Sequence, residues 1–217
     1  MIWIILAFAI LLTVYCIFEG KGKFVPATAL KVALSASIAV FAWVCAISHG
    51  LEAPLVMMAA GLTLAVPADY FLQYIKSDGK RYEAGILCFA GMHICLLFSY
   101  VDRFSIHWQE FAIFALILGA LLLLQTLQKW DLGRQKLPLS VYTVLVVLMA
   151  SKSISLGLLF PAKETFLIAA GGLCFVASDM VLGVWDYHDE KKIFLLLNRI
   201  IYFCGQLLFA LSVFFYS

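Results

Sequence analysis

The chain has 217 residues, of which 65% are hydrophobic and 13% charged, with a net charge of +2 and a mean hydropathy of +1.03. A soluble domain carries about a quarter of charged residues, so this composition excludes an ordinary soluble protein. The apolar runs are about 20 residues long, which fits membrane-spanning helices and not the shorter, alternating strands of a membrane barrel. We therefore expect an all-α integral membrane protein.

Eight apolar segments follow one another with short connections, which predicts a single polytopic membrane domain over residues 1–217. The predicted spans are about 2–18, 25–48, 52–75, 82–101, 106–128, 137–160, 164–187 and 191–216. The first span has no basic leading segment and no small-residue cleavage site. We expect it to be a retained helix and not a signal peptide.

Positive charge gathers on one face of the predicted bundle. The loops after the first, third, fifth and seventh spans hold Lys21, Lys23, Lys76, Lys80, Arg81, Lys129, Arg134, Lys136, Lys191 and Lys192. The loops on the other face hold only Arg103 and Lys163. The positive-inside rule then predicts a multi-pass protein of a bacterial inner membrane with both termini outside the cytoplasm. The basic loops would lie against anionic lipid, and no nucleic-acid partner is expected.

The six cysteines are expected to act as small apolar side chains. All of them fall within predicted spans, without a C-x-x-C pair or a Cys/His ligand spacing. A disulfide framework or a zinc site is therefore not expected, and no cofactor is predicted.

The chain also reads as two copies of a four-helix unit, over residues 1–101 and 106–217. The segment GLTLAVPADYFL, residues 61–72, aligns with GGLCFVASDMVL, residues 171–182, so that Asp69 falls on Asp179. Pro26 and Pro138 open the preceding spans at similar distances from the two aspartates. Four helices separate the equivalent positions, which predicts a parallel repeat.

Ionisable residues inside the spans identify the candidate site. They are Lys31, Asp69, His93, Lys152, Asp179 and Arg199. A charged side chain at the centre of a membrane helix costs about 2.5–3.5 kcal/mol. We therefore expect these residues to face one another or a wet cavity, and an intramembrane charge is by default a candidate functional residue.

Depth in the membrane brings most of these groups into one layer. All except Lys152 fall in the inner half or near the middle of their spans, on the side of the basic loops. Tyr202 and Gln206 follow Arg199 at i+3 and i+7 and extend the polar stripe on the last span. Residues 185–190 are expected to form the wet end of the seventh span.

Purely structural roles stay open for several of these residues. Arg199 and Asp179 could form an ion pair that holds the last two spans together. Lys31 could extend to the membrane surface, and His93 could be a hydrogen-bonded residue of the bundle. Tyr142 and Tyr202 fit packing or interfacial positions. The two aspartates at matching positions are the strongest functional candidates.

Ordered motifs in these spans resemble the YhhN family of eight-helix membrane proteins. They are G-L-x-L-A-x-x-A-D-x-x-L ending at Leu72, G-x-x-x-F-x-x-x-H ending at His93, Tyr142 with Met149, G-x-x-x-F-x-x-S-D ending at Asp179, and R-x-x-Y-x-x-x-Q ending at Gln206. The likeness runs from about Lys31 to Gln206. Two positions depart from the family pattern: Ala68 replaces a glycine, and Ala65 replaces a serine, which removes a hydroxyl.

The resemblance implies a lysoplasmalogenase, which hydrolyses the vinyl ether bond of a lysoplasmalogen to a fatty aldehyde and glycerophosphoethanolamine or glycerophosphocholine. Such an enzyme needs an acid that protonates the vinyl carbon and a second carboxylate that stabilises the resulting cation. We expect Asp69 and Asp179 to be catalytic. Asp69 is the first choice for the acid because no cation neighbours it in sequence, with Asp179 ionised beside Arg199 or Lys31; the reverse stays open.

The same resemblance implies a lysophospholipid substrate and a binding role for the remaining polar groups. Lys31 and Arg199 are candidates for the phosphate. His93, Tyr202 and Gln206 complete the predicted substrate-binding set, and no metal is required. Two other functions stay open. A proton-coupled transporter predicts a polar path to both faces, and a structural membrane subunit predicts tolerance of Asp69→Asn.

Overall fold

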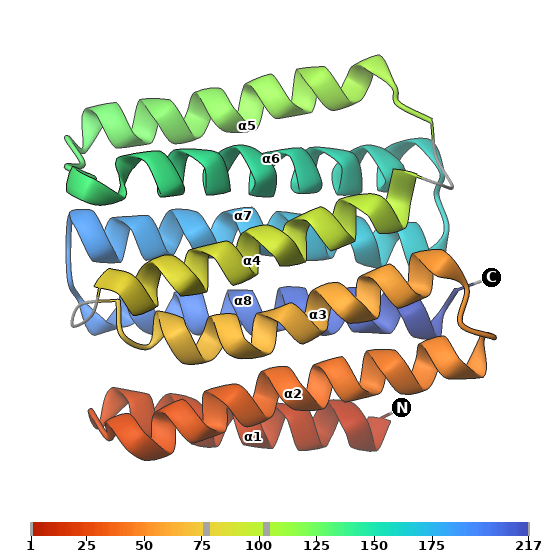
Figure 1. Cartoon of the computed structure of the whole chain (residues 1–217), viewed down its shortest axis with the longest axis horizontal. Helices are drawn as coiled ribbons and strands as arrows, with labels where there is room; N and C mark the ends of the chain where they lie inside the picture. The colour runs from red at the N-terminus through yellow and green to blue at the C-terminus, as the bar shows by residue number, and fades with distance from the viewer. Residues whose placement is uncertain (1, 76–78, 102–104, 217) are drawn as a thin grey trace.

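The computed structural model describes residues 2–75, 79–101 and 105–216, and within them the chain forms eight long α-helices and one short 3-10 turn (Figure 1). The helices are α1 (Ile2–Gly20), α2 (Phe24–Ser48), α3 (Ala53–Leu72), α4 (Gly79–Val101), α5 (Trp108–Leu127), α6 (Lys136–Leu159), α7 (Lys163–Tyr187) and α8 (Lys192–Phe214), with the turn η1 (Gly133–Gln135) before α6. Each helix is long and apolar enough to cross a membrane. The expected eight-helix, all-α membrane fold is confirmed.

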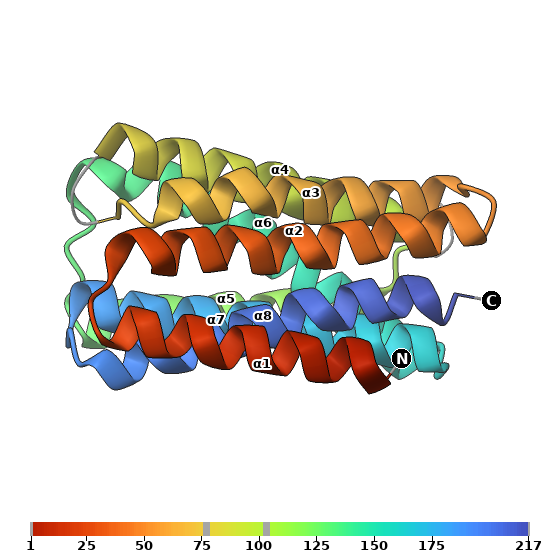
Figure 2. The same cartoon turned by 90° about the horizontal axis from the view of Figure 1, so that it is seen from below.

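Six of the helices close into a ring. In the order α2, α3, α4, α6, α7 and α8, each helix packs against the next, and α8 returns to α2. Figure 2 shows α2, α3 and α4 as one layer above α8 and α7. Lys31 and Asp69 meet each other between two ring helices, whereas Lys152 pairs with a residue of α5 and Arg199 with a residue of α1.

The two remaining helices lie outside the ring. α1 packs against α2 and α8, and α5 packs against α6. Almost nothing on these two helices is buried: α1 buries Leu12 and Tyr15, and α5 buries no residue. A helix that is apolar all round and still exposed suits contact with lipid, so α1 and α5 form the outer wall of the bundle.

The packing pattern bears on the predicted repeat. The contacts of α1 with α2, α2 with α3 and α3 with α4 have counterparts in α5 with α6, α6 with α7 and α7 with α8. The contact of α4 with α6 corresponds in the same way to that of α8 with α2. Two parallel four-helix units would give this pattern. The repeat itself stays a prediction, since similar packing can arise without a common origin.

The loops divide the molecule into two ends. α1, α3, α5 and α7 finish at the end of the bundle that carries Lys21, Lys23, Lys129, Lys191 and Lys192, at the left of Figure 1, and we call this the basic end. Lys76 and Arg103, two residues of the charge count, lie outside the described residues. Both described chain ends lie at the opposite end.

Candidate functional site

A pocket opens inside the ring at the basic end. Its volume is about 140 Å³, and every one of the six ring helices contributes to its wall. The polar lining residues are Lys31, Asp69, Tyr82, Gln125, Trp130, Tyr142, Thr143, Asp179, Asp186, Tyr187, Asn198, Arg199 and Tyr202. Both aspartates of the predicted site therefore line one shared pocket, together with Lys31, Arg199 and Tyr202.

Asp69 is paired with a cation and with two hydroxyl groups. Lys31 Nζ on α2 lies 3.1 Å from Asp69 Oδ1, and both side chains are only 1% exposed. The Tyr202 hydroxyl on α8 donates to Asp69 Oδ2 at 2.7 Å, and Ser35 Oγ donates to the same oxygen. A buried carboxylate is tolerated when it is paired and hydrogen-bonded in this way.

This ion pair changes the expected division of roles. No sequence neighbour of Asp69 carries a cation, which made Asp69 the first choice for the acid. Lys31 reaches it from the neighbouring helix, so the premise of that choice does not hold. The predicted contact of Lys31 with Asp179 is also not formed. The geometry favours the reverse assignment, which the sequence had left open.

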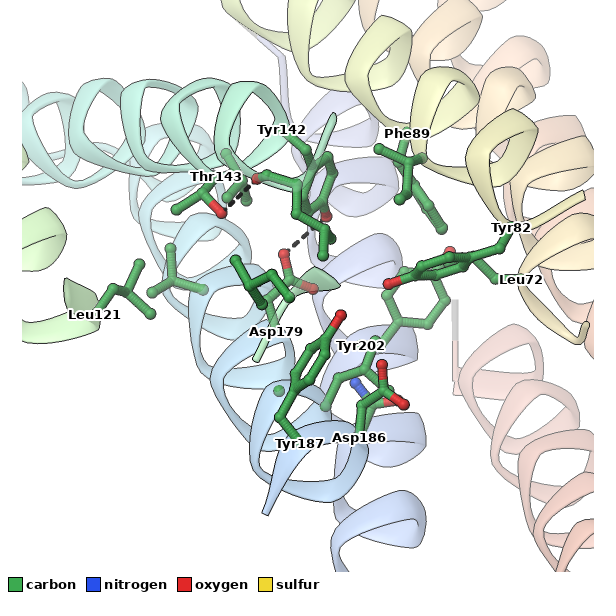
Figure 3. A pocket seen from close by; sticks show the side chains of 18 of the residues that line it. Leu72, Tyr82, Phe89, Leu121, Tyr142, Thr143, Asp179, Asp186, Tyr187 and Tyr202 are labelled. Carbon is green, nitrogen blue, oxygen red and sulfur yellow. Dashed lines mark hydrogen bonds between the residues drawn. The ribbon is translucent and has the colours of Figure 1, made fainter. Parts of the chain in front are cut away.

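Asp179 lies in different surroundings. Its Oδ2 accepts a hydrogen bond of 2.7 Å from the Tyr142 hydroxyl (Figure 3). In the described part of the chain, no Lys or Arg forms an ion pair with Asp179. Val176 and Leu182, one turn away on the same helix face, line the pocket beside it. The two carboxyls thus share a pocket but differ in charge environment.

His93 and Gln206 lie behind the pocket wall, each in contact with one of two tyrosines. His93 Nε2 lies 3.3 Å from the Tyr142 hydroxyl, and Gln206 Nε2 donates to the Tyr202 hydroxyl. Both side chains are fully buried. The Tyr202 hydroxyl thus donates to Asp69 and accepts from Gln206. Neither residue lines the pocket, so direct contact with a substrate is not supported.

Arg199 pairs with a residue that was not predicted to take part. Arg199 Nη2 lies 3.4 Å from Glu19 Oε1 on α1, and Nη1 donates to Asn198 Oδ1 at 3.3 Å. Gln73 at the end of α3 donates to the second oxygen of Glu19 at 3.0 Å. The ion pair considered between Arg199 and Asp179 is not formed. Arg199 still lines the pocket from α8.

Sequence reasoning missed several members of the site. Ser35 and Asn198 are uncharged, and an isolated Ser or Asn carries little signal in a membrane helix. Asn198 Nδ2 donates to the carbonyl of Ser178 at 2.8 Å and ties α8 to α7 beside Asp179. Tyr142 belongs to the ordered motifs, but its sequence position also fits a packing residue. Glu19 sits at the end of the first span, where a charge needs no special explanation.

Lys152 is separate from this site, as its predicted depth in the membrane indicated. Its Nζ lies 2.7 Å from Glu110 Oε1 on α5 and donates to the carbonyl of Ser105 at 2.7 Å. This buried ion pair lies at the end opposite the pocket and attaches α5 to α6. Among the described residues, no group of three or more His, Cys, Asp or Glu side chains is arranged to hold a metal ion.

Comparison with known proteins identifies the same family that the ordered motifs resemble. The sequence profile of the YhhN family matches residues 26–213, which include both aspartates, both tyrosines and all six ring helices almost completely. No curated protein and no solved structure gives a significant match to the chain. The matched range covers most of the sequence, and the chain belongs to the YhhN family.

Proposed function

We propose that this protein is a hydrolase of the lysoplasmalogenase type, which cleaves the vinyl ether bond of a lysoplasmalogen. The observation that supports it best is the pair of carboxyls on one pocket, of which one is paired with Lys31 while the other accepts from the Tyr142 hydroxyl and has no ion-pair partner among the described residues. Carboxyls whose surroundings differ in this way divide into an acid and a charged partner. Membership of the YhhN family is consistent with this activity.

A vinyl ether must be protonated before water can attack it. Asp179 is the acid, because its Oδ2 is bonded to Tyr142 while Oδ1 is left to carry a proton into the pocket. Burial away from cations favours the neutral form of a carboxyl. Transfer of this proton to the outer vinyl carbon converts the vinyl ether to an oxocarbenium ion and leaves Asp179 as a carboxylate.

Asp69 is the ionised partner in this scheme. Its charge stabilises the oxocarbenium ion, and it takes a proton from the water that adds to the cationic carbon. Tyr202, which lines the pocket and donates to Asp69, lies on the route of that proton. The hemiacetal hydroxyl then gives its proton to Asp179, and the leaving glycerol oxygen takes one from Asp69. Both carboxyls return to their starting states, and one water is consumed.

The shape and position of the pocket fit a lysophospholipid better than a transported solute. The lining residues come from the halves of the helices next to the basic end and, for Trp130 and Leu132, from the connection after α5. The apolar part of the wall, which includes Leu72, Ile86, Leu121, Leu139 and Val146, suits an alkenyl chain. Arg199 supplies a guanidinium for the phosphate. A carrier with alternating access would instead need polar groups leading to both faces.

The direct test is to incubate the purified protein in detergent with 1-alkenyl-glycerophosphoethanolamine and to measure the fatty aldehyde released. Carried out in D₂O with immediate reduction of the aldehyde, the reaction should place one deuterium on the carbon next to the carbonyl. The matched 1-alkyl lipid, which has a saturated ether, should not be cleaved. No aldehyde, or aldehyde without deuterium at that carbon, contradicts the proposed chemistry.

The two aspartates are tested by isosteric substitution. Asp179→Asn and Asp69→Asn should each lower kcat at least about a hundredfold, since a positioned acid or base contributes about 10²–10⁴. Asp189→Asn is the control, because Asp189 is an aspartate outside the pocket that forms a surface ion pair with Lys191. Near-normal turnover of a purified, folded Asp179→Asn or Asp69→Asn protein would remove that residue from the mechanism.

A further inference from the structure

The pocket is too small to enclose the substrate proposed above. Its volume of about 140 Å³ is close to that of an engineered apolar cavity of about 150 Å³ that takes up benzene. One lipid chain extends through about half of a hydrocarbon core that is about 30 Å thick. Most of an alkenyl chain therefore has to lie outside the pocket, and it must leave the pocket between two helices.

Charged and uncharged lining residues come from different helices. Lys31 on α2, Asp69 on α3 and Arg199 on α8 line the pocket from one part of the ring. Over the described range 108–159, α5, α6 and the connection between them contribute no charged residue to the lining. Asp179 on α7 accepts the hydrogen bond from Tyr142 on α6 and so lies at the border of the two parts. A lysoplasmalogen has the same order, with its vinyl ether between a polar headgroup and an apolar chain.

One face of α7 runs from a tight helix contact into the pocket. Gly172, Val176, Asp179 and Gly183 follow one another at intervals of three or four residues and therefore lie on this face. At Gly172 the face touches α6, because a Cβ there would lie 2.7 Å from Ser153 Cβ. The other three positions line the pocket. Small residues thus close the space between α6 and α7 in the half away from the basic end.

The facing side of α6 shows the same change along its length. Val146, Tyr142 and Leu139 continue the face of Ser153 towards the basic end, and all three line the pocket. Thr143 lines it beside them, and its hydroxyl donates to the Leu139 carbonyl of the same helix at 2.8 Å. That hydroxyl needs no partner from a ligand. The pocket therefore extends between the faces of α6 and α7, and its wall on α6 suits an apolar chain.

The indole of Trp130 closes this space towards the basic end. A Cβ built on Gly183 would lie only 2.5 Å from the indole, and its three nearest atoms all belong to that ring and not to α6. The outer side of the ring is covered by Tyr187, which stacks on it with centroids 5.7 Å apart. Closed by Trp130 at one end and by the Gly172 contact at the other, the space between α6 and α7 has its remaining side towards α5.

α5 forms that remaining side. Leu121 and Gln125, one turn apart, line the pocket although α5 packs outside the ring against α6. Figure 3 shows Leu121 on α5, apart from the other labelled residues. α5 buries no residue, so its surface beyond Leu121 is the lipid-facing surface of the bundle. A chain that reaches Leu121 is therefore at the boundary with the bilayer.

We propose that the alkenyl chain of the substrate leaves the pocket between α6 and α7 and runs past Leu121 along α5 into the bilayer. This inference rests on the proposed function, because it locates the chain of the same lysophospholipid. The headgroup lies towards Lys31 and Arg199, and the vinyl ether lies at Asp179. The bilayer accommodates the rest of the chain, so the enzyme accepts chains longer than its pocket.

The kinetic test compares a long and a short chain on one variant. Leu121→Trp places a large ring in the path of the chain. It should lower the ratio of kcat/KM for 1-hexadecenyl-glycerophosphocholine to kcat/KM for the 1-propenyl lipid at least about tenfold, since two methylenes that stay unburied account for about that factor. The short chain ends close to the vinyl ether and does not reach α5.

Leu122→Trp is the matched control for this test. Leu122 is 52% exposed on the same helix and is not among the residues that line the pocket, so the ratio should stay within about twofold of the wild-type ratio. Thermal unfolding in detergent shows whether each variant is folded, and Leu121→Phe is a smaller change at the same position. A folded Leu121→Trp or Leu121→Phe protein with the wild-type ratio, or an equal change in the control, would overturn the inference.

Photo-crosslinking of the wild-type protein locates the chain without any reaction. The probe is a 1-alkyl-glycerophosphocholine with a diazirine in the middle of its chain, and its saturated ether is not cleaved. Peptide mass spectrometry should find labels on α5 that an excess of the alkyl lipid without diazirine suppresses. The competitor separates bound probe from probe in the detergent around α5. Suppressible labels only on helices other than α5, α6 and α7, or no suppressible label, would overturn the inference.

The two experiments also separate this inference from the proposed reaction. Suppressible labelling of α5 without release of aldehyde from the alkenyl lipid would reject the reaction alone. Release of aldehyde with suppressible labelling of α1, α2 or α3 in place of α5 would reject the path of the chain alone.

Discussion

The two carboxyls of the site are the same chemical group and differ in the side chains that surround them. Asp69 has a partner on each oxygen: Lys31 forms an ion pair at Oδ1, and Tyr202 and Ser35 donate to Oδ2. Asp179 has one tyrosine at Oδ2. A second polar residue lies behind each tyrosine, Gln206 in the first case and His93 in the second. Each chain of hydrogen bonds ends on a carboxyl that lines the same pocket.

Replacement of Lys31 by methionine tests whether the ion pair stabilises the fold as well as the charge state. Lys31→Met leaves Asp69 buried without its cation, and removing one partner of a buried pair costs about 3–5 kcal/mol. The double variant Lys31→Met/Asp69→Leu should recover most of that stability but no activity. Unfolding in detergent and aldehyde release measure the two effects. A Lys31→Met protein as stable as the wild type would show that the ion pair contributes little to the free energy of folding.

At the scale of helices, the ring is held together by close contacts at small residues. A Cβ on Gly172 of α7 would lie 2.7 Å from Ser153 Cβ and 3.3 Å from Ala150 Cα of α6. Small residues at such positions let the two backbones approach, which supplies much of the packing energy between membrane helices. Since Asp179 and Tyr142 lie on the same two helices, this contact also fixes the geometry of the candidate acid.

Gly172→Ala should therefore lower both stability and activity. Overpacking at a tight helix contact costs about 1–3 kcal/mol, and the spread of α6 from α7 should lengthen the Tyr142–Asp179 hydrogen bond. Gly119→Ala is the matched control, since a Cβ at Gly119 on lipid-facing α5 meets nothing within 4 Å. Thermal unfolding in detergent and kcat report the two effects. Equal unfolding temperatures of the two variants would contradict the tight contact.

α1 adds to the site from outside the family match. The YhhN profile begins at residue 26, after α1 has ended, yet Glu19 of α1 is the ion-pair partner of Arg199. Gln73 of α3 also donates to Glu19. One side chain of an otherwise lipid-facing helix thus helps to position a guanidinium that lines the pocket, and it does so without belonging to the ordered motifs.

At the scale of the whole molecule, the pocket occupies one end of a closed six-helix ring, the end with the basic loops. The opposite end carries the Lys152–Glu110 pair and is not part of the pocket. If the basic end faces the cytoplasm, a substrate reaches the pocket from the inner leaflet. The side of the membrane that supplies the lipid thus depends on the orientation that the positive-inside rule predicts.

The orientation is measurable by labelling cysteines at the two ends of α7. His188→Cys follows α7 at the basic end, and Ala162→Cys precedes it at the other, and both positions are exposed. In a background without the six native cysteines, an impermeant maleimide added to intact bacterial cells should label Cys at 162 but not at 188. Inverted vesicles should give the reverse. Labelling at 188 from outside would show that both termini face the cytoplasm.

The helices and the layer of the candidate site were predictable from the sequence, because the length of the apolar segments and the cost of burying a charge in lipid determine them. Eight helices, their order and approximate bounds follow from segments of about 20 apolar residues. That Lys31, Asp69, Asp179 and Arg199 line one pocket follows from their similar depth, because charged groups in a membrane must avoid lipid. The alignment of residues 61–72 with residues 171–182 places the two aspartates at matching positions, and these are the residues on which the proposed chemistry depends.

Only the tertiary structure decided which of these groups meet. Lys31 pairs with Asp69 and Arg199 with Glu19, while Asp179 is left to Tyr142. These contacts join residues far apart in the chain, and depth alone does not say which helices are neighbours. The neighbours are set by the way the helix faces fit around the ring. For that reason the sequence determined the layer in which the carboxyls lie, and packing determined which of them has a cation as its partner.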